Sequence, residues 1–300
     1  MTITLEHTNS SSIAAALIRE RRRAGSPAMG MVLTLVIVTS EDDAETALTD
    51  ARTATREHPA RLLGVVLGSA RGAARVDAEV RTGSGVAGEM ALIRLSGEVV
   101  PHAESVVLPL LLPDSPVVVW WPGYAPEHPA ADPLGRLAKR RITDAAAVPR
   151  AKSRAMLTQC RNYSPGNTDL AWTRITAWRA LLAAALDQET AKVTAASVTG
   201  ERISPSADLL GAWLASRLKV KVSRHYSKGP GITQVVLTTK DGDVSITRLD
   251  GKLAILSSPG QPDRPVAIKR RQVCELLSEE LRRLDPDDVY ARTVKWLAKH

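Results

Sequence analysis

The chain has 300 residues, of which 44% are hydrophobic and 24% charged, and this balance is typical of a globular protein and excludes global disorder. Its formal net charge of +8 permits binding to nucleic acid or to an acidic protein surface, and it equally suits a soluble protein rich in arginine. Two cysteines, Cys160 and Cys274, exclude a disulfide framework and match no zinc motif. Because the apolar runs are too short for a spanning helix and no secretory signal is visible, we expect a cytoplasmic protein without membrane contact.

The first elements predict an α/β domain. After ten frayed residues, a helix is expected from Ser11 or Ser12 to Arg23. Residues 31–38, a run rich in Val, Ile and Leu, predict a buried strand. A helix from Ser40 to His58 and a second strand over residues 62–67 complete a βαβ unit, whose crossover we expect to be right-handed.

A β-hairpin is expected next. Residues 75–81 alternate apolar and charged side chains, and residues 90–95 return after a glycine-rich turn at Gly83 to Gly88. A helix over Pro101 to Leu112 follows, which Pro109 should kink or shorten.

The stretch over residues 106–123, VVLPLLLPDSPVVVWWPG, is the centre of this domain and the leading candidate for a working surface. Its run over residues 117–121 does not alternate, and this pattern predicts a strand covered on both faces, the usual state of a central parallel strand. The strand ends at Trp120 and Trp121, where open α/β sheets bind ligands.

A long loop from Pro122 to Pro133 follows, and a dozen irregular residues in a compact domain usually mark a functional loop. A short helix over residues 134–138, capped by Asp132, ends it. The two tryptophans, Tyr124 and the basic triplet 139–141 indicate an interaction surface, since Trp and Arg dominate binding hot spots. The alternative is that the tryptophans pack beneath the loop as core, which suits one of them better than both.

The second half predicts an α+β domain. Turn residues at 162–169 lead into a helix from Thr168 or Asp169 to about Leu186, in which Trp172 and Trp178 lie about 120° apart and need not face one pocket. The later segments are a strand at 193–198, a helix at 207–218 capped by Ser204 or Ser206, a strand at 218–223, a meander over 232–239, 244–249 and 253–256, and helices at 269–284 and 286–298.

We therefore predict two domains. Residues 1–162 form an α/β domain with a mixed, mainly parallel sheet, helices on both faces and a β-hairpin. Residues 163–300 form an α+β domain with an antiparallel meander.

Catalytic motifs are missing from the sequence. Residues 39–42, after the first strand, carry two acidic side chains where a dinucleotide fold needs glycines, and no P-loop, GxSxG or HExxH is present. We therefore expect no catalytic residues, no metal ligands and no cofactor. Nucleic acid is an improbable partner because Tyr226 is the only aromatic residue near the basic strip, and stacking platforms need several.

Two smaller features have competing interpretations. Lys219, Lys221, Arg224 and Lys228 form a strip that either attracts an anion or is an ordinary solvated face. Cys160 is either redox-active or an inert helix cysteine.

Three stretches in order, HAESVVLPLLLPDSPVVVWWPG, DPLGRLAKRRITDA and YSPGNTDLAWTRITAWRALLAAAL, resemble the signatures of the OpcA family, the glucose-6-phosphate dehydrogenase assembly proteins. The resemblance covers essentially the whole chain, more loosely in the C-terminal part. It implies a non-catalytic partner that assists or activates glucose-6-phosphate dehydrogenase, at the entry to the oxidative pentose phosphate pathway, with glucose 6-phosphate involved only indirectly. The alternatives are a sugar-phosphate-binding enzyme or sensor, and a basic nucleic-acid-binding protein.

The expected partner-binding residues are Trp and Arg side chains at element ends and the polar residues beside them. They are Trp120, Trp121, Pro122, Gly123, Asp132, Arg136, Arg140, Arg141, Asp144, Asp169, Trp172, Arg174, Trp178 and Arg179.

Overall fold

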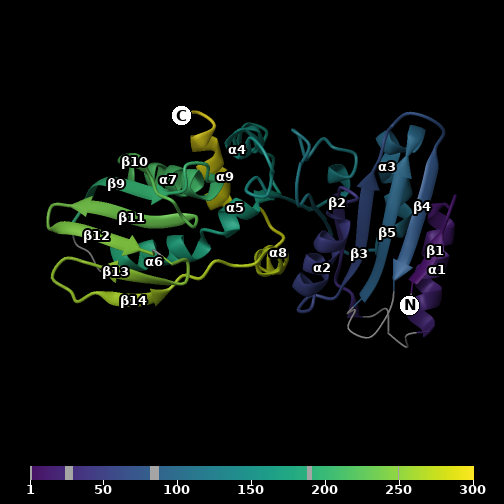
Figure 1. The fold of residues 1–300 in the computed structure, drawn as a ribbon, viewed down its shortest axis with the longest axis horizontal. Coiled ribbons are helices and arrows are strands. Elements are labelled where there is room, and N and C mark those ends of the chain that lie inside the picture. The colour runs from purple at the N-terminus through teal and green to yellow at the C-terminus, as the bar shows by residue number, and fades with distance from the viewer. Residues whose placement is uncertain (1, 24–29, 82–87, 188–190, 249) are drawn as a thin grey trace. The chain divides into compact units, whose positions relative to one another are not determined.

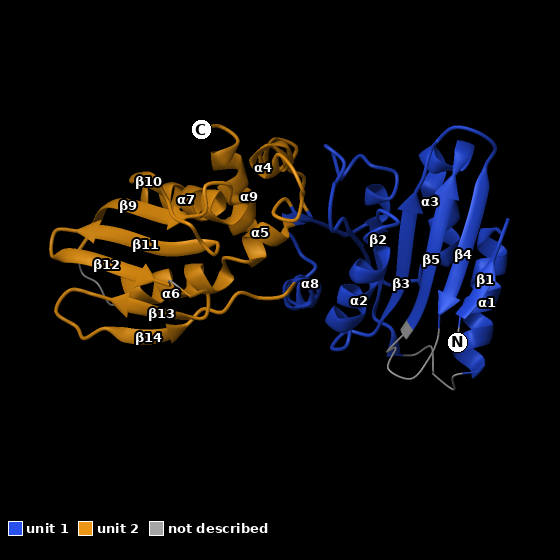
Figure 2. Cartoon of the chain, viewed as in Figure 1, with its two compact units in different colours: residues 1–144, 166–168, 273–286 blue, residues 145–165, 169–272, 287–300 orange. Residues whose placement is uncertain are grey.

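The computed structural model of the chain describes residues 2–23, 30–81, 88–187, 191–248 and 250–300. These residues form two compact units (Figure 2). Unit 1 contains residues 1–144, 166–168 and 273–286, and unit 2 contains residues 145–165, 169–272 and 287–300. The chain therefore passes between the units at several points, whereas the sequence predicts one boundary between residues 162 and 163. As a statement about domains, that boundary stays a prediction.

Unit 1 is built on an eight-stranded mixed sheet (Figure 1) with the order β1-β4-β5-β3-β2-β6-β7-β8. The strands are β1 (Thr2–Leu5), β2 (Leu33–Thr39), β3 (Ala60–Leu67), β4 (Arg75–Arg81), β5 (Gly88–Ser96), β6 (Val117–Trp120), β7 (Arg140–Thr143) and β8 (Asn167–Asp169). Strands β5, β3, β2, β6 and β7 pair in parallel, and β4 and β1 add antiparallel pairs at one edge. This arrangement confirms the predicted mixed, mainly parallel sheet.

The central strands explain the apolar runs in the sequence. Strand β6 lies between β2 and β7, and all four of its residues are buried, as predicted. The predicted hairpin is formed by β4 and β5, but its turn at residues 83–88 falls mostly outside the described residues. The prediction that the first ten residues are frayed is wrong, because β1 pairs with β4 at the edge of the sheet, with Ile3 opposite Val80.

Helices cover both faces of this sheet. Helix α1 (Ser10–Arg23) packs against β4 and β5, and helix α2 (Ala44–Ala54) packs against β2 and β3. The faces differ because neighbouring strand residues point opposite ways: Leu63 joins the core beneath α1, whereas Leu48 of α2 packs over Gly64.

The remaining helical segments of unit 1 are short or come late in the sequence. They are η2 (Gly97–His102), α3 (Ala103–Val107), η3 (Leu108–Leu110), η4 (Gly135–Leu137) and α8 (Val273–Arg282). The helix predicted over residues 101–112 is broken, because Pro109 cannot donate a backbone hydrogen bond and clashes in a helix interior. Helix α8 packs on α2.

Unit 2 contains a six-stranded sheet with the order β10-β9-β11-β12-β13-β14. Its strands are β9 (Val193–Gly200), β10 (Lys221–Tyr226), β11 (Ile232–Thr239), β12 (Gly242–Thr247), β13 (Leu253–Ser257) and β14 (Arg264–Ala267). The pairs from β11 to β14 are antiparallel, which confirms the meander, and β14 extends it beyond the prediction. Leu249, at the end of one predicted strand, lies outside the described residues.

The helices of unit 2 are α4 (Lys152–Arg161), α5 (Leu170–Thr173), α6 (Thr176–Leu186), α7 (Pro205–Leu218) and α9 (Asp288–Leu297). The predicted helix over 168–186 is divided between α5 and α6. The strand predicted from residue 218 begins at Lys221, because Lys219 ends α7 with a left-handed backbone (φ 58°). No helix in the described part of the chain is long and apolar enough to cross a membrane.

Candidate functional site

The predicted partner-binding residues divide between the two units, and whether they bind a partner stays a prediction. Unit 1 holds Trp120, Trp121, Pro122, Gly123, Asp132, Arg136, Arg140, Arg141 and Asp144, and unit 2 holds Asp169, Trp172, Arg174, Trp178 and Arg179.

The tryptophan pair in unit 1 is buried: Trp120 is 1% and Trp121 2% exposed. The expectation that at least one of them is exposed at the strand end is therefore wrong. Trp121 packs with Leu134 and Ala138 because the following loop folds back over it, and its backbone N–H donates to the carbonyl of Ile142 at 2.9 Å. Trp121 therefore supports the loop from below.

The loop from Pro122 to Pro133 is tied down at its far end. The Asp132 carboxylate accepts the backbone N–H groups of Leu134 and Gly135 at 3.0 and 3.1 Å, which confirms the predicted cap. Burial raises the pKa of Asp132 above its ordinary value. A Cβ at Gly135 would lie 1.8 Å from the Pro129 carbonyl oxygen, so only glycine allows this close approach.

The outer surface of the same loop is open to solvent. Tyr124 is 68% exposed, Arg136 is exposed, and Pro122 and Gly123 are half-buried. The structure therefore presents an exposed aromatic ring and a guanidinium group on a segment that buried residues hold in place.

The basic triplet is mostly inside unit 1. Arg140 donates to Glu280 at 2.5 Å and to the Asp285 carbonyl at 3.0 Å. Arg141 donates to the Asn167 side chain at 2.6 Å, and Asp144 is 1% exposed. The expectation of an exposed arginine pair is wrong, because these arginines belong to β7 and lie in the sheet between β6 and β8.

In unit 2, Asp169 and Trp172 are structural. Asp169 caps α5: its carboxylate accepts from the backbone N–H groups of Ala171 at 2.8 Å and Ala145 at 3.0 Å. The Trp172 indole donates to Asp287 at 2.8 Å, and the Arg179 guanidinium lies 3.7 Å from the centre of its ring. A cation over an indole face is attracted by the ring quadrupole.

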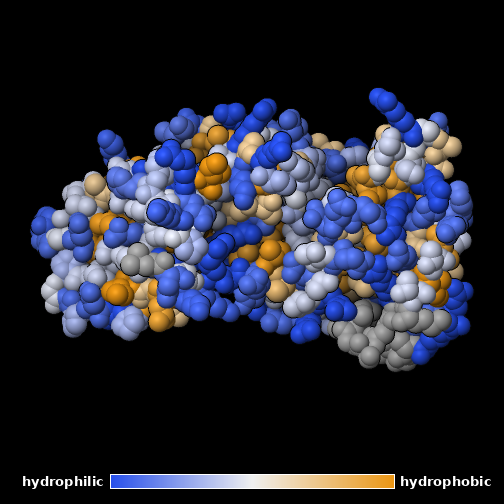
Figure 3. Space-filling model, viewed as in Figure 1, coloured by the Kyte–Doolittle hydropathy of each residue, from blue (hydrophilic) through white to orange (hydrophobic). Residues whose placement is uncertain are grey.

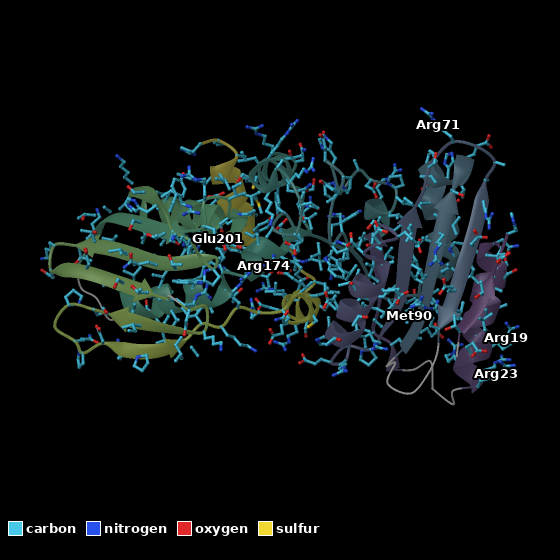
Figure 4. All side chains as sticks on the ribbon, viewed as in Figure 1. Arg19, Arg23, Arg71, Met90, Arg174 and Glu201 are labelled. Atoms are coloured by element: carbon cyan, nitrogen blue, oxygen red, sulfur yellow. The ribbon has the colours of Figure 1, made fainter. Side chains whose placement is uncertain are left out.

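Trp178 and Arg174 line a different feature, a pocket of about 200 Å³ in unit 2. Figure 4 shows Arg174 and Glu201, two of its lining residues, in the same region of unit 2. The basic side chains around the pocket are Lys152, Arg174, Arg248, Lys269, Arg270 and Arg271. Sequence reasoning missed this pocket; the Lys269-Arg270-Arg271 triplet was the available signal.

The predicted anion-attracting strip does not line that pocket. Lys219, Lys221 and Lys228 are exposed, whereas Arg224 is engaged by Asp208 at 3.3 Å and by the Glu201 carbonyl at 2.8 Å. Anion binding by the strip stays a prediction.

Cys160 is 2% exposed in α4, and its sulfur lies 3.6 Å from that of Met156. Burial raises the pKa of its thiol to about 12, which disfavours the thiolate that redox chemistry requires. A redox role stays a prediction. Among the described residues, no three His, Cys, Asp or Glu side chains gather as a metal site.

A mainly parallel sheet covered by helices in unit 1 and a sheet with an antiparallel meander in unit 2 define a protein of two units, one α/β and one α+β. Residues 51–162 match a family model described as the glucose-6-phosphate dehydrogenase subunit N-terminal domain, and residues 165–294 match one described as the C-terminal domain of that subunit. The chain belongs to the OpcA family, the glucose-6-phosphate dehydrogenase assembly proteins.

Comparison with curated proteins gives no match. Among solved structures, the chain is similar to an oxidoreductase from Sinorhizobium meliloti, with 11% identity and a TM-score of 0.46 over 89% of this chain and 95% of that one. It is also similar to UDP-N-acetylglucosamine 3-dehydrogenase from Acidithiobacillus ferrooxidans, with 9% identity and a TM-score of 0.33 over the same shares. Both TM-scores are below 0.5, so neither likeness carries an argument.

Proposed function

We propose that this chain binds glucose-6-phosphate dehydrogenase through the outer surface of the loop from Pro122 to Pro133 and the adjoining Arg136. It acts as a non-catalytic assembly factor or activator and supports the oxidative pentose phosphate pathway in the cytoplasm. Membership of the OpcA family supports the partner and the role. The observation that carries the docking surface is Tyr124, which is 68% exposed on a loop that buried residues hold in place.

Support from below matters for affinity, because ordering a mobile loop costs free energy on binding. Trp121 packs under the loop, and Asp132 fixes its far end through two backbone hydrogen bonds. The buried residues of the predicted site thus prepare the surface, and the exposed residues contact the partner.

The exposed residues have the chemistry of a protein interface. Tyrosine and arginine are enriched among residues that dominate binding energy, and Tyr124 and Arg136 are both exposed here. Lys139 is also exposed but pairs with Asp285 at 3.2 Å, and Glu127 of the loop is exposed as well, so the facing surface of the dehydrogenase is expected to carry charges of both signs. On the face seen in Figure 3, hydrophobic residues are scattered among hydrophilic ones.

The proposal is tested by measuring the Kd for the dehydrogenase with Tyr124→Ala and Arg136→Glu variants. Each is expected to weaken binding by at least tenfold, about 1.4 kcal/mol. The matched controls are Tyr226→Ala, a tyrosine 57% exposed in unit 2, and Arg71→Glu, at an exposed arginine of unit 1 (Figure 4). Unchanged affinity in both loop variants, or an equal loss in the controls, would show that the partner docks elsewhere.

A further inference from the structure

A second cavity of unit 2, with a volume of about 720 Å³, shares no described lining residue with the basic pocket. It is formed by α4, α7 and β10 together with the end of α9 and the residues that follow α9, and we call it the α7 hollow. In Figure 1, α4, α7 and α9 lie side by side. Sites for small organic molecules have volumes of about 300–1,000 Å³. The α7 hollow therefore has the size of such a site.

The walls of the α7 hollow are largely apolar. Their larger apolar side chains are those of Met156, Leu157, Val222, Trp296 and Leu297. Met156 is 1% exposed, whereas Trp296 is half-buried. Apolar and aromatic walls with a few polar groups are typical of small-molecule sites, so the ligand needs an apolar body.

Gly211 of α7 leaves space in this hollow that the fold itself does not require. It lies in the interior of a 14-residue helix, where glycine is less stable than alanine. A Cβ at Gly211 would have a single neighbour within 4 Å, the Cγ1 of Val222 at 3.8 Å. Gly64 of unit 1 differs, because a Cβ there would lie 3.0 Å from the Leu92 side chain. Close packing thus explains Gly64 and does not explain Gly211, which lines the hollow.

Asp208, three residues before Gly211 on the same face of α7, supplies an acceptor in the hollow. Its Oδ1 accepts a hydrogen bond from Arg224 Nε at 3.3 Å, and the carboxylate has no other such bond in the described part of the chain. Burial raises the pKa of the Asp208 carboxyl above its ordinary value, because apolar surroundings disfavour its charge. A donor from a ligand would stabilise this carboxylate.

The basic side chains at the hollow limit what the donor can be. The Arg224 guanidinium is committed to the fold, because it also donates to the carbonyl oxygens of His225 at 2.7 Å and Glu201 at 2.8 Å. Arg161 and Lys299 line the hollow and are exposed. A positively charged ligand would be repelled by these two side chains. A neutral N–H donor suits Asp208 better.

We propose that the α7 hollow binds the base of a purine nucleoside or nucleotide, with an N–H group of the base donating to Asp208. A purine base has flat faces that pack on apolar and aromatic side chains, and its edge carries neutral N–H groups that proteins recognise by hydrogen bonds. Both properties match the walls and the acceptor described above. The inference goes beyond the proposed docking function and does not depend on it.

The experiment is calorimetric titration of the full chain with adenosine, adenosine monophosphate and purine riboside, which is adenosine without its amino group. We expect heat from the first two. Purine riboside should bind at least about tenfold more weakly, because it leaves Asp208 without a donor. Adenosine and the monophosphate separate the two sources of the base: a phosphate that contacts Arg161 or Lys299 makes the monophosphate bind more tightly, and equal affinities assign the nucleoside part alone.

Gly211→Leu tests the cavity, because the new side chain fills space in the hollow. We expect adenosine binding to weaken at least about tenfold while the urea midpoint rises, since leucine favours a helix more than glycine does. A variant that is more stable cannot owe its loss of binding to unfolding. Ala184→Leu is the matched control, because it adds the same side chain at an exposed position of α6 and should change binding by less than about twofold.

Asp208→Asn tests the acceptor independently. The amide oxygen is held toward Arg224 and its NH₂ group then meets the base, so we expect adenosine to bind at least about tenfold more weakly. Asp243→Asn removes the same charge at an exposed position of β12 and should have less than about a twofold effect. Circular dichroism checks that each variant is folded.

Three results would each overturn the proposal. They are absence of heat from both adenosine and its monophosphate, equal affinities for adenosine and purine riboside, and unchanged adenosine binding in Gly211→Leu. None of these measurements involves the dehydrogenase, so failure here and failure of the docking proposal are distinguishable.

Discussion

The guanidinium of Arg140 and the carboxylate of Glu280 lie 2.5 Å apart, although 140 positions separate them in the sequence. Both side chains are nearly inaccessible, at 4% and 7% exposure. The pair fastens α8 to β7 within unit 1, and Arg140 also donates to the Asp285 carbonyl beyond the end of α8. Arg140 therefore stabilises unit 1 and is not a free docking side chain.

Removal of Glu280 should destabilise the protein strongly. Glu280→Ala leaves the Arg140 charge buried without its partner, and breaking such a pair costs about 3–5 kcal/mol. Urea unfolding measures the loss. Replacement of both residues, Arg140→Met with Glu280→Leu, should restore most of the stability. The control is Glu57→Ala, which removes an exposed ion pair with Arg282 of α8. This variant should leave the urea midpoint unchanged. Equal effects of Glu280→Ala and Glu57→Ala would contradict the structure.

Gly135→Ala should disturb the docking loop. The new Cβ would lie 1.8 Å from the Pro129 carbonyl oxygen, which is a backbone atom and cannot rotate away. We expect a loss of about 1–3 kcal/mol in thermal unfolding, together with weaker binding to the dehydrogenase. Gly123→Ala, in the adjoining loop, is the control for the stability measurement, because no atom lies within 4 Å of its added Cβ. If both glycine variants behave alike, the close approach at Gly135 has no energetic role.

Trp121→Ala and Tyr124→Ala should separate stability from binding. Trp121 is 2% exposed beneath the loop, and loss of a buried tryptophan costs about 3–5 kcal/mol. Tyr124 is 68% exposed, so its removal should change unfolding by less than about 0.5 kcal/mol while weakening the dehydrogenase complex. Chemical denaturation and a binding assay on both variants provide the comparison. A large loss of stability in Tyr124→Ala would mean that this ring packs on the protein.

Acid should weaken unit 1 through an ion-pair network on β4 and β5. The pKa of Glu79 lies below its ordinary value of 4.5, chiefly because Arg81 donates a hydrogen bond to its carboxylate. Burial opposes this shift, and a hydrogen bond from Arg94 adds to it. A carboxylate with a depressed folded pKa stabilises the fold above its unfolded pKa and loses this contribution as the pH falls through the folded pKa. The urea midpoint should therefore decline below about pH 4.5, and less so in Arg94→Met. High salt should shrink the difference between the two proteins. Identical acid profiles would exclude a contribution from Arg94.

Thiol labelling should distinguish the two cysteines. Cys160 is buried and its pKa is raised to about 12, whereas Cys274 in α8 is half-buried. We expect one thiol to react with a thiol reagent near pH 8 in the native protein and both to react after unfolding, since the thiolate is the reactive form. In Cys274→Ser, fast native labelling should disappear. Fast native labelling of that variant would restore the redox interpretation of Cys160.

Much of the fold follows from local patterns in the sequence. The unalternating runs over β2, β3 and β6 predicted buried parallel strands, and the alternation in β4 predicted the hairpin. Strand β7 was missed because its sequence, RRIT, begins with two charged residues. Glu280 neutralises Arg140, and the Asn167 side chain accepts a hydrogen bond from Arg141. Both partners come later in the chain, so no local pattern reveals that the two arginines are buried.

The candidate sites were harder to predict than the fold. The sequence located the loop after Trp121 but did not show that Trp121 packs under it, because one apolar residue at a strand end suits either position. The basic pocket combines Lys152, Arg248 and Arg270 from segments that are far apart in the sequence. Only the fold brings such residues together, and their spacing along the chain carries no sign of it.

The late position of α8 has a consequence for synthesis of the protein. Residues 273–286 belong to unit 1, where Leu276, Leu277 and Leu281 are buried and α8 packs on α2. A ribosome releases β2, α2 and β3 long before it has made this helix. The nascent sheet domain therefore lacks the packing of α8 on α2 until residues 273–286 have emerged, and a partly packed domain is more prone to aggregate during that interval.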